Sequence, residues 1–114
     1  MALKSYTEDR INDNVVVVSW VLTPSDTAQA YANPDYADVS VSMEGIWGGA
    51  TVSMTGSNGS TYSTLNDPFN VGIAFTSDDC AAIVENTHYR KPAISGGSGS
   101  SVTVYLLARR TMRP

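Results

Sequence analysis

Cysteine and histidine are almost absent from this sequence, and their scarcity limits the chemistry open to it. The single cysteine, Cys80, excludes an intrachain disulfide and with it a disulfide-stapled secreted scaffold. The single histidine, His88, nearly excludes histidine-based metal cages, and a Ser-His-Asp triad would have to use it. A nucleophilic Cys80–His88 pair is the remaining option. Packing explains Cys80 and a structural or surface role explains His88, so we expect a non-enzymatic protein with no catalytic residues, metal or cofactor.

Charge is also sparse, because only 16% of the 114 residues are charged and the net charge is −4. Binding to nucleic acid needs clustered Lys and Arg, and the one basic cluster is "ARRTMRP" at residues 108–114. No run approaches the ~18 apolar residues of a membrane span. The opening "MALKSYTEDRIND" lacks the apolar core of a signal peptide. These features predict a protein that folds in a reducing cytosol without a nucleic-acid or membrane partner.

Turn signals and alternating apolar residues dominate what is present. The stretch "TVSMTGSNGSTYSTL", residues 51–65, contains Asn58-Gly59, the dipeptide best suited to a two-residue type I′ turn. That turn would pair Val52 with Leu65 and would place both on one apolar face together with Met54. The other face would then be rich in Ser and Thr.

A second two-residue turn is offered by Gly48-Gly49, and it would pair Met43 with Met54. The two turns, taken independently, assign the same apolar face to the strand between them. The sequence therefore predicts three consecutive paired strands, at residues 38–47, 50–57 and 61–66.

The remaining segments extend this all-β pattern. We expect strands near residues 14–24, 73–75, 89–96 and 101–110, with a loop at 25–36. The run "NVVVVSWVLTP" (14–24) is typical of a strand buried on both sides or packed at an interface. "TSDDCAAIVENTHY" breaks the alternation, and its capping residues and alanines predict one or two turns of helix. The predicted fold is an antiparallel β-sandwich or related barrel of about seven strands with one short helical connection.

The predicted domain organisation is an N-terminal arm (1–13), a sandwich domain (14–110) and a C-terminal tail (111–114). The arm has no apolar period, so it gains little by folding on its own monomer, and ordering it costs roughly 1–2 kcal/mol per residue. We therefore expect the arm and the Ser/Thr face to contact neighbouring proteins. The candidate interface residues are Lys4, Tyr6, Glu8, Arg10, Ser40, Ser42, Thr51, Ser53, Thr55 and Tyr62.

Two stretches covering residues 46–109 resemble a family of small structural proteins of tailed bacteriophages. They are "WGGATVSMTGSNGSTYSTLNDP" and "VENTHYRKPAISGGSGSSVTVYLLAR". The matching positions are Gly48, Gly49, Gly56, Ser57, Asn58, Tyr89, Pro92, Gly96 and Gly97. The resemblance implies a virion protein, a capsid decoration (cement) protein that forms homo-oligomers on the head and stabilises its lattice. It also implies the major capsid protein or other virion proteins as partners.

Other functions stay open at the level of sequence. A neck or tail component is one alternative within the same family resemblance. The segment "SNGSTY" also resembles discoidin-like carbohydrate-binding sandwiches, in which an aromatic residue follows the turn. Exposed aromatics among Trp20, Trp47, Tyr31, Tyr36, Tyr62 and Tyr89 would then bind a glycan. A small hydrolase ranks far below both readings.

Overall fold

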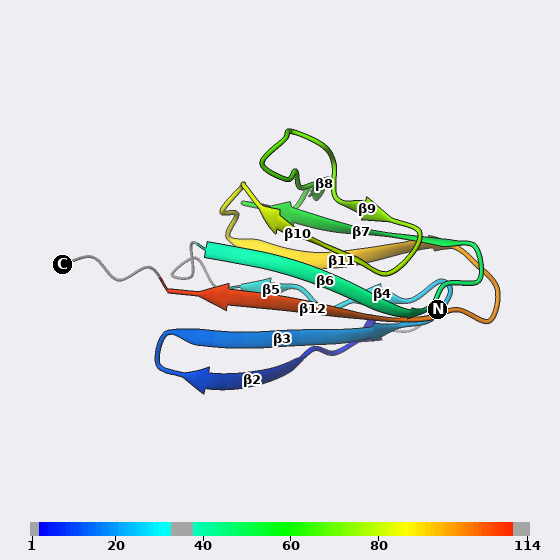
Figure 1. The fold of residues 1–114 in the computed structure, drawn as a ribbon, viewed down its shortest axis with the longest axis horizontal. Helices are drawn as coiled ribbons and strands as arrows, with labels where there is room; N and C mark the ends of the chain where they lie inside the picture. Colours follow the sequence, from blue (N-terminus) through cyan, green and yellow to red (C-terminus); the bar gives the residue numbers. More distant parts are fainter. Residues whose placement is uncertain (1–2, 33–37, 111–114) are drawn as a thin grey trace.

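The computed structural model describes residues 3–32 and 38–110, and they form two β-sheets packed face to face (Figure 1). The five-stranded sheet has the order β10-β6-β12-β3-β2: Asp79–Ile83, Asp38–Ile46, Ser101–Arg109, Val15–Leu22 and Thr7–Asn12. The seven-stranded sheet has the order β1-β4-β11-β7-β8: Leu3–Lys4, Thr27–Ala28, Tyr89–Gly96, Ala50–Ser57 and Ser63–Thr64. In addition, β5 (Tyr31–Ala32) pairs with β11 and β9 (Ala74–Phe75) pairs with β7. The predicted all-β sandwich is confirmed.

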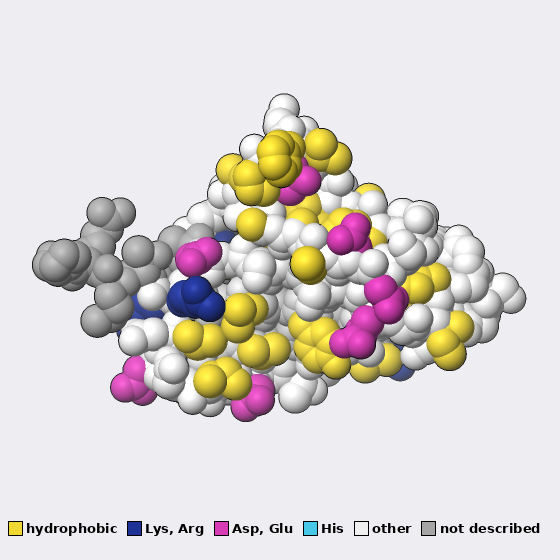
Figure 2. All heavy atoms as spheres, viewed as in Figure 1, with side chains coloured by type: hydrophobic (Ala, Val, Ile, Leu, Met, Phe, Trp, Pro, Cys, Tyr) yellow, Lys and Arg dark blue, Asp and Glu magenta, His cyan; other side chains and the backbone are white. Residues whose placement is uncertain are grey.

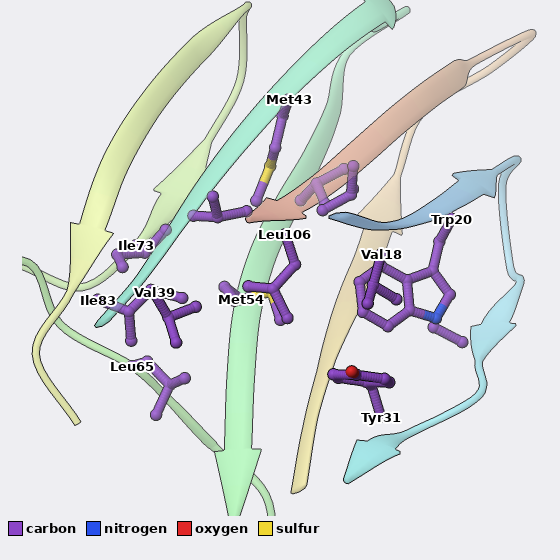
Figure 3. Close-up of a cluster of buried hydrophobic side chains, with 14 of the residues drawn as sticks. Val18, Trp20, Tyr31, Val39, Met43, Met54, Leu65, Ile73, Ile83 and Leu106 are labelled. Atoms are coloured by element: carbon purple, nitrogen blue, oxygen red, sulfur yellow. The ribbon is translucent and has the colours of Figure 1, made fainter. Parts of the chain in front are cut away.

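Alternating side chains from both sheets fill the single core. On β12 the inward residues are Val102, Val104, Leu106 and Ala108, and all four are fully buried, as the sequence predicts. Inward methionines from β6 and β7 and an inward tryptophan from β3 meet them there (Figure 3). Each buried Val, Leu or Met side chain stabilises the fold by roughly 1.5–3 kcal/mol relative to an exposed one.

Strand β3 is buried on one face only. Its inward residues are buried, whereas Val15 and Val17 are half-buried and Val21 is exposed. The prediction of burial on both sides is therefore wrong for the chain by itself, and β3 presents valines on the outside of the sheet.

The predicted hairpin between 38–47 and 50–57 does not form, because β6 and β7 lie in different sheets. The tight turn is present: the Ala50 N–H donates to the Trp47 carbonyl at 2.8 Å, and Gly48 and Gly49 have φ of 53° and 84°. Beyond it the two strands diverge, so Met43 and Met54 reach the core from opposite sheets. Two strands joined by a connection that crosses between sheets show the same inward alternation as a hairpin. The sequence pattern therefore cannot distinguish the two arrangements.

Strand β7 does pair with β8, but with a register two residues away from the predicted one. Thr55 lies opposite Thr64, and the Leu65 N–H donates to the Met54 carbonyl at 2.9 Å. A two-residue shift preserves the face, so Val52, Met54 and Leu65 are all buried as predicted. Neither residue of Asn58-Gly59 has a positive φ, so this dipeptide makes no type I′ turn.

The predicted helical connection is wrong, since the described residues contain no helix and this segment forms β10. All five residues of β10 pair antiparallel with β6, from Asp79 opposite Met43 to Ile83 opposite Val39. Asp78 and Asp79 are not helix caps. The Asp78 carboxylate accepts the Trp47 indole N–H at 2.8 Å, while Asp79 accepts the Cys80 N–H. Pairing along the free edge of β6 outweighs the weak local helix signals.

The N-terminal segment is part of the sandwich and not a separate arm. β2 pairs antiparallel with β3, and β1 pairs parallel with β4, so residues 3–12 contribute to both sheets. All six residues of β2 are exposed, which explains why the sequence shows no apolar period there. The predicted tail at 111–114 lies outside the described residues.

The turn at Gly48 generates a test of the fold. A Cβ on Gly48 would lie 2.3 Å from the Ser98 carbonyl oxygen, on a backbone with φ of +53°, whereas a Cβ on Gly59 would meet nothing within 4 Å. We expect Gly48→Ala to lower the free energy of unfolding by about 1–3 kcal/mol. Gly59→Ala should change it by less than about 0.5 kcal/mol. Urea titrations followed by tryptophan fluorescence measure both, and equal effects would contradict the turn.

Candidate interaction surfaces

Tyr6 and Glu8 contact residues of their own chain. The Tyr6 ring packs edge-on against Trp20 and Tyr31, with ring centroids 6.2 and 5.2 Å apart. The Tyr31 hydroxyl donates to the Glu8 carboxylate at 2.9 Å. These contacts tie β2 and the residues before it to the core, so both predicted interface residues have a structural role within the monomer.

Lys4 and Arg10 lie on the same N-terminal segment. The Lys4 ammonium is 3.8 Å from the Asp26 carboxylate. Asp26 also accepts hydrogen bonds from the Thr23 hydroxyl and N–H at 2.6 and 2.7 Å, and these bonds lower the pKa of Asp26. Arg10 is exposed. The predicted binding arm is therefore largely engaged with its own monomer.

The predicted Ser/Thr face is divided between two surfaces. Ser40 and Ser42 lie on β6 and face outward from the five-stranded sheet. Thr51, Ser53 and Thr55 lie on β7 on the outer side of the seven-stranded sheet, where Thr51 and Ser53 are half-buried and Thr55 is buried. The two groups are on opposite outer faces of the sandwich because β6 and β7 are not paired.

Within the second group, Thr55 and Tyr62 are already engaged. The Thr55 hydroxyl donates to the Lys91 carbonyl at 2.7 Å. The Lys91 ammonium lies 4.4 Å from the centroid of the half-buried Tyr62 ring, a cation–π contact. Neither side chain is an exposed aromatic or hydroxyl platform for a glycan.

The residues considered for catalysis do not form a reactive group with their neighbours. Cys80 is exposed on β10, and the His88 ring packs edge-on against Tyr89, with 4.4 Å between centroids. Among residues 3–32 and 38–110, no three His, Cys, Asp or Glu side chains gather where they could hold a metal. The same part of the chain shows no pocket and contains no helix whose length and apolarity would let it cross a membrane.

One buried charge was not anticipated from the sequence. Arg90 on β11 points into the sandwich and is fully buried. Its Nη2 donates to the Asn86 side-chain carbonyl, while Nε and Nη1 find no hydrogen-bond partner among residues 3–32 and 38–110. Burial lowers the pKa of Arg90 because desolvation disfavours the charged form. The alternation of "YRKPAI" places Arg90 inward, whereas an arginine side chain usually lies on the surface.

Residues 66–72, between β8 and β9, form a loop with exposed apolar side chains, named the apolar loop below. The Asp67 carboxylate accepts the N–H groups of Phe69 and Val71 at 2.9 and 3.0 Å, and Asn70 has φ of 63°. The Asp67 N–H donates to the Val71 carbonyl at 2.9 Å. The loop is thus internally bonded, yet Phe69 is 86% and Val71 57% exposed. Figure 2 shows hydrophobic side chains gathered on this protrusion beside β8 and β9.

The base of the apolar loop is fastened to the strand-to-strand connection after β10. The Glu85 carboxylate accepts the Asn66 backbone N–H and the Asn66 side-chain amide, each at 2.8 Å. The bond from the Asn66 backbone lowers the pKa of Glu85, because it favours the charged carboxylate. An ordered base lets the loop present its apolar side chains without further ordering.

A second apolar surface is the outer face of the five-stranded sheet. Its outward side chains include Val15, Val17 and Val21 of β3 and Tyr105 and Leu107 of β12. Figure 2 shows hydrophobic side chains gathered over β3 and β12, with acidic side chains around them. Alternation over 101–110 also implies that Tyr105 and Leu107 face outward, although only the inward residues of this segment were considered as packing positions.

Comparisons with known proteins bear on the fold alone. The sequence matches no protein-family model and no curated protein. Among solved structures, it is similar to an uncharacterized double-stranded β-helix protein of Klebsiella pneumoniae, with TM-score 0.47, 15% identity, and coverage of 96% of this chain and 75% of that one. A cupin domain of Bordetella pertussis gives TM-score 0.38 and 15% identity, over 96% and 94% of the two chains. Fe(II) HppE gives TM-score 0.37 and 12% identity, over 83% and 42%. Matches this weak assign no activity to this chain. Its own strands form an all-β sandwich of two sheets.

Proposed function

We propose that this chain is a non-enzymatic structural subunit of a tailed-bacteriophage particle, a decoration protein that binds the capsid exterior and stabilises its lattice. The observation that carries the proposal is the apolar loop, an internally bonded hairpin that holds Phe69 86% exposed. Ordered apolar side chains in water are typical of a protein surface that another protein covers.

Three further features support a structural role. The described residues bring together no metal-ligating group and no pocket that a substrate would enter. The sequence resemblance to small virion proteins extends to Asp67-Pro68 in the first half of the apolar loop. Charge is sparse at 16%, which lowers the desolvation cost of docking against protein.

The glycan-binding alternative has less support. Of the aromatics considered for a stacking platform, Trp20 and Tyr31 are buried in the core and Trp47 donates its indole N–H to Asp78. The exposed aromatic ring of the apolar loop is a phenylalanine with no polar handle. A neck or tail position uses the same kind of surface, and an electron cryo-microscopy map of the particle distinguishes it from the head.

Phe69→Ser tests the role of the apolar loop. We expect the free variant to keep its stability, because Phe69 is exposed, while its occupancy on particles falls. Losing a central aromatic contact weakens an interface by about 2 kcal/mol or more, so affinity should drop at least ~30-fold. Quantitative mass spectrometry of purified particles measures occupancy, with the exposed Ser60→Ala as control. Unchanged occupancy would exclude this loop, and absence of the wild-type chain from particles would refute the proposed function.

The hydrogen bonds of Glu85 to the base of the apolar loop predict that the stability of the protein depends on pH. Its pKa is lowered in the folded state, so its contribution to stability is present above the unfolded pKa and is lost as pH falls through the folded pKa. We expect the urea midpoint to fall between about pH 5 and about pH 3. Glu85→Gln should reduce that dependence, whereas Asp13→Asn, at an exposed turn position, should keep it. Parallel pH profiles for Glu85→Gln and wild type would contradict the anchoring role.

A further inference from the structure

At two levels of the outer face of the five-stranded sheet, large side chains on β12 stand beside small ones on β6 and β10. On β12, Leu107 and Tyr105 face outward, and Val17 of β3 lies beside Leu107. On the other side of β12, Leu107 lies opposite Ser40 and Tyr105 opposite Ser42 of β6. The next strand, β10, also carries small side chains there, with Ala82 beside Ser40 and Cys80 beside Ser42. At these two levels the large side chains of β12 and the small ones of β6 and β10 stand on either side of a line between β12 and β6. At the next two levels the larger residue is on β6, where Glu44 lies opposite Thr103 and Ile46 opposite Ser101.

The charges follow the same line. Arg109, at the end of β12, is directly opposite Asp38, at the start of β6, and both are exposed. One charge of each sign therefore lies at the same height on either side of the line between the two strands.

We propose that this face binds a second copy of the chain about a two-fold axis that runs parallel to the strands between β6 and β12. Such an axis exchanges β12 with β6 and β3 with β10. Leu107 and Tyr105 of each copy then lie over Ser40 and Ser42 of the other, and Val17 lies over Ala82. Each Arg109 meets the Asp38 of the other copy, so the contact forms twice.

A second copy is the occupant because the face is complementary to itself. A two-fold interface requires one surface to carry both members of every contact, and here large residues match small ones and a cation matches an anion. Aligned sheet-on-sheet packing supplies the geometry. Small Ser and Ala side chains on the receiving half allow the close approach that such packing needs.

The size of the face suits a weak dimer. The proposed axis overlays the four strands β10, β6, β12 and β3, which have 5, 9, 9 and 8 residues, and it leaves β2 with no strand opposite it. At about 3.3 Å per residue and about 4.8 Å between strands, the four strands cover about 500 Å² per partner, below the ~800 Å² of a standard interface and in the range of weak complexes. Figure 2 shows that this side of the molecule is broad, with hydrophobic side chains in its middle. The pairing uses a different surface from the apolar loop and does not depend on the capsid role.

Reversing the two charges separately tests the two-fold contact. Arg109→Glu and Asp38→Arg should each weaken the dimer at least tenfold, because each homodimer would contain two like-charge contacts. An equimolar mixture should restore the dimer, since each variant then offers the other two opposite-charge contacts. Both charges are neighbours within one chain as well, but mixing leaves those intrachain pairs unchanged. Sedimentation velocity and native mass spectrometry of the full chain at about 100 µM, at low and high salt, measure the outcome.

A size substitution provides an independent test. Ser40→Tyr fills the position that would receive Leu107, so it should abolish dimerisation while the unfolding midpoint stays near that of wild type. Ser53→Tyr makes the same change on the outer face of the other sheet and should leave the dimer intact. Cys80 lies on the proposed interface and is the only thiol, so its alkylation rate should fall with rising protein concentration.

The outcomes separate this inference from the proposed function. A wild-type monomer at about 100 µM, or failure of the mixed variants to pair, would overturn the dimer. Equal loss of dimer in Ser40→Tyr and Ser53→Tyr would also overturn it, because the contact would not be specific to this face. A dimer that forms as described but never binds particles would refute the capsid role and leave the dimer standing.

Discussion

The whole structure depends on one shared layer of apolar side chains between the two sheets. Each sheet buries one face against the other, and neither could remain folded in water alone. The central strand β12 supplies four fully buried residues to this layer, and β3, β6 and β7 fill it from both sides. Once that layer is formed, everything else is set by alternation: the next residue along each strand lies on an outer face. The outer face proposed to bind a second copy is a consequence of that division.

Which residues are inside could be predicted from the sequence, but which strands pair could not. Alternation correctly placed Val52, Met54, Leu65 and the inward residues of β12 in the core. It could not tell that β6 and β7 belong to different sheets, because a hairpin and a crossing between sheets bury the same side chains. The segment forming β10 was misread as helix, since its capping and alanine signals are local and the free edge of β6 is not visible in sequence.

The interface residues show the same limit. Ser40 and Ser42 were predicted on a surface and lie on one, but Thr51, Ser53 and Thr55 lie on the other side of the molecule. Tyr6 and Glu8 hold the N-terminal strands to the core through Trp20 and Tyr31. The apolar loop was missed because a turn motif says nothing about the exposure of the phenylalanine within it. Arg90 was missed because a buried guanidinium with unsatisfied nitrogens contradicts the usual preference of its residue type.

The position of β12 has a consequence for how the chain reaches this fold. Its neighbours in the sheet are β3 and β6, so Arg109 pairs with Val15 on one side and with Asp38 on the other. The centre of the five-stranded sheet is therefore joined by residues far apart along the chain. The conformational entropy of closing these long loops is lost before contacts in the core stabilise the fold. A topology dominated by distant pairings folds slowly compared with one built from local hairpins. Until β12 docks, β3 and β6 each have an unpaired edge, and the incompletely folded chain is most prone to aggregation in that interval.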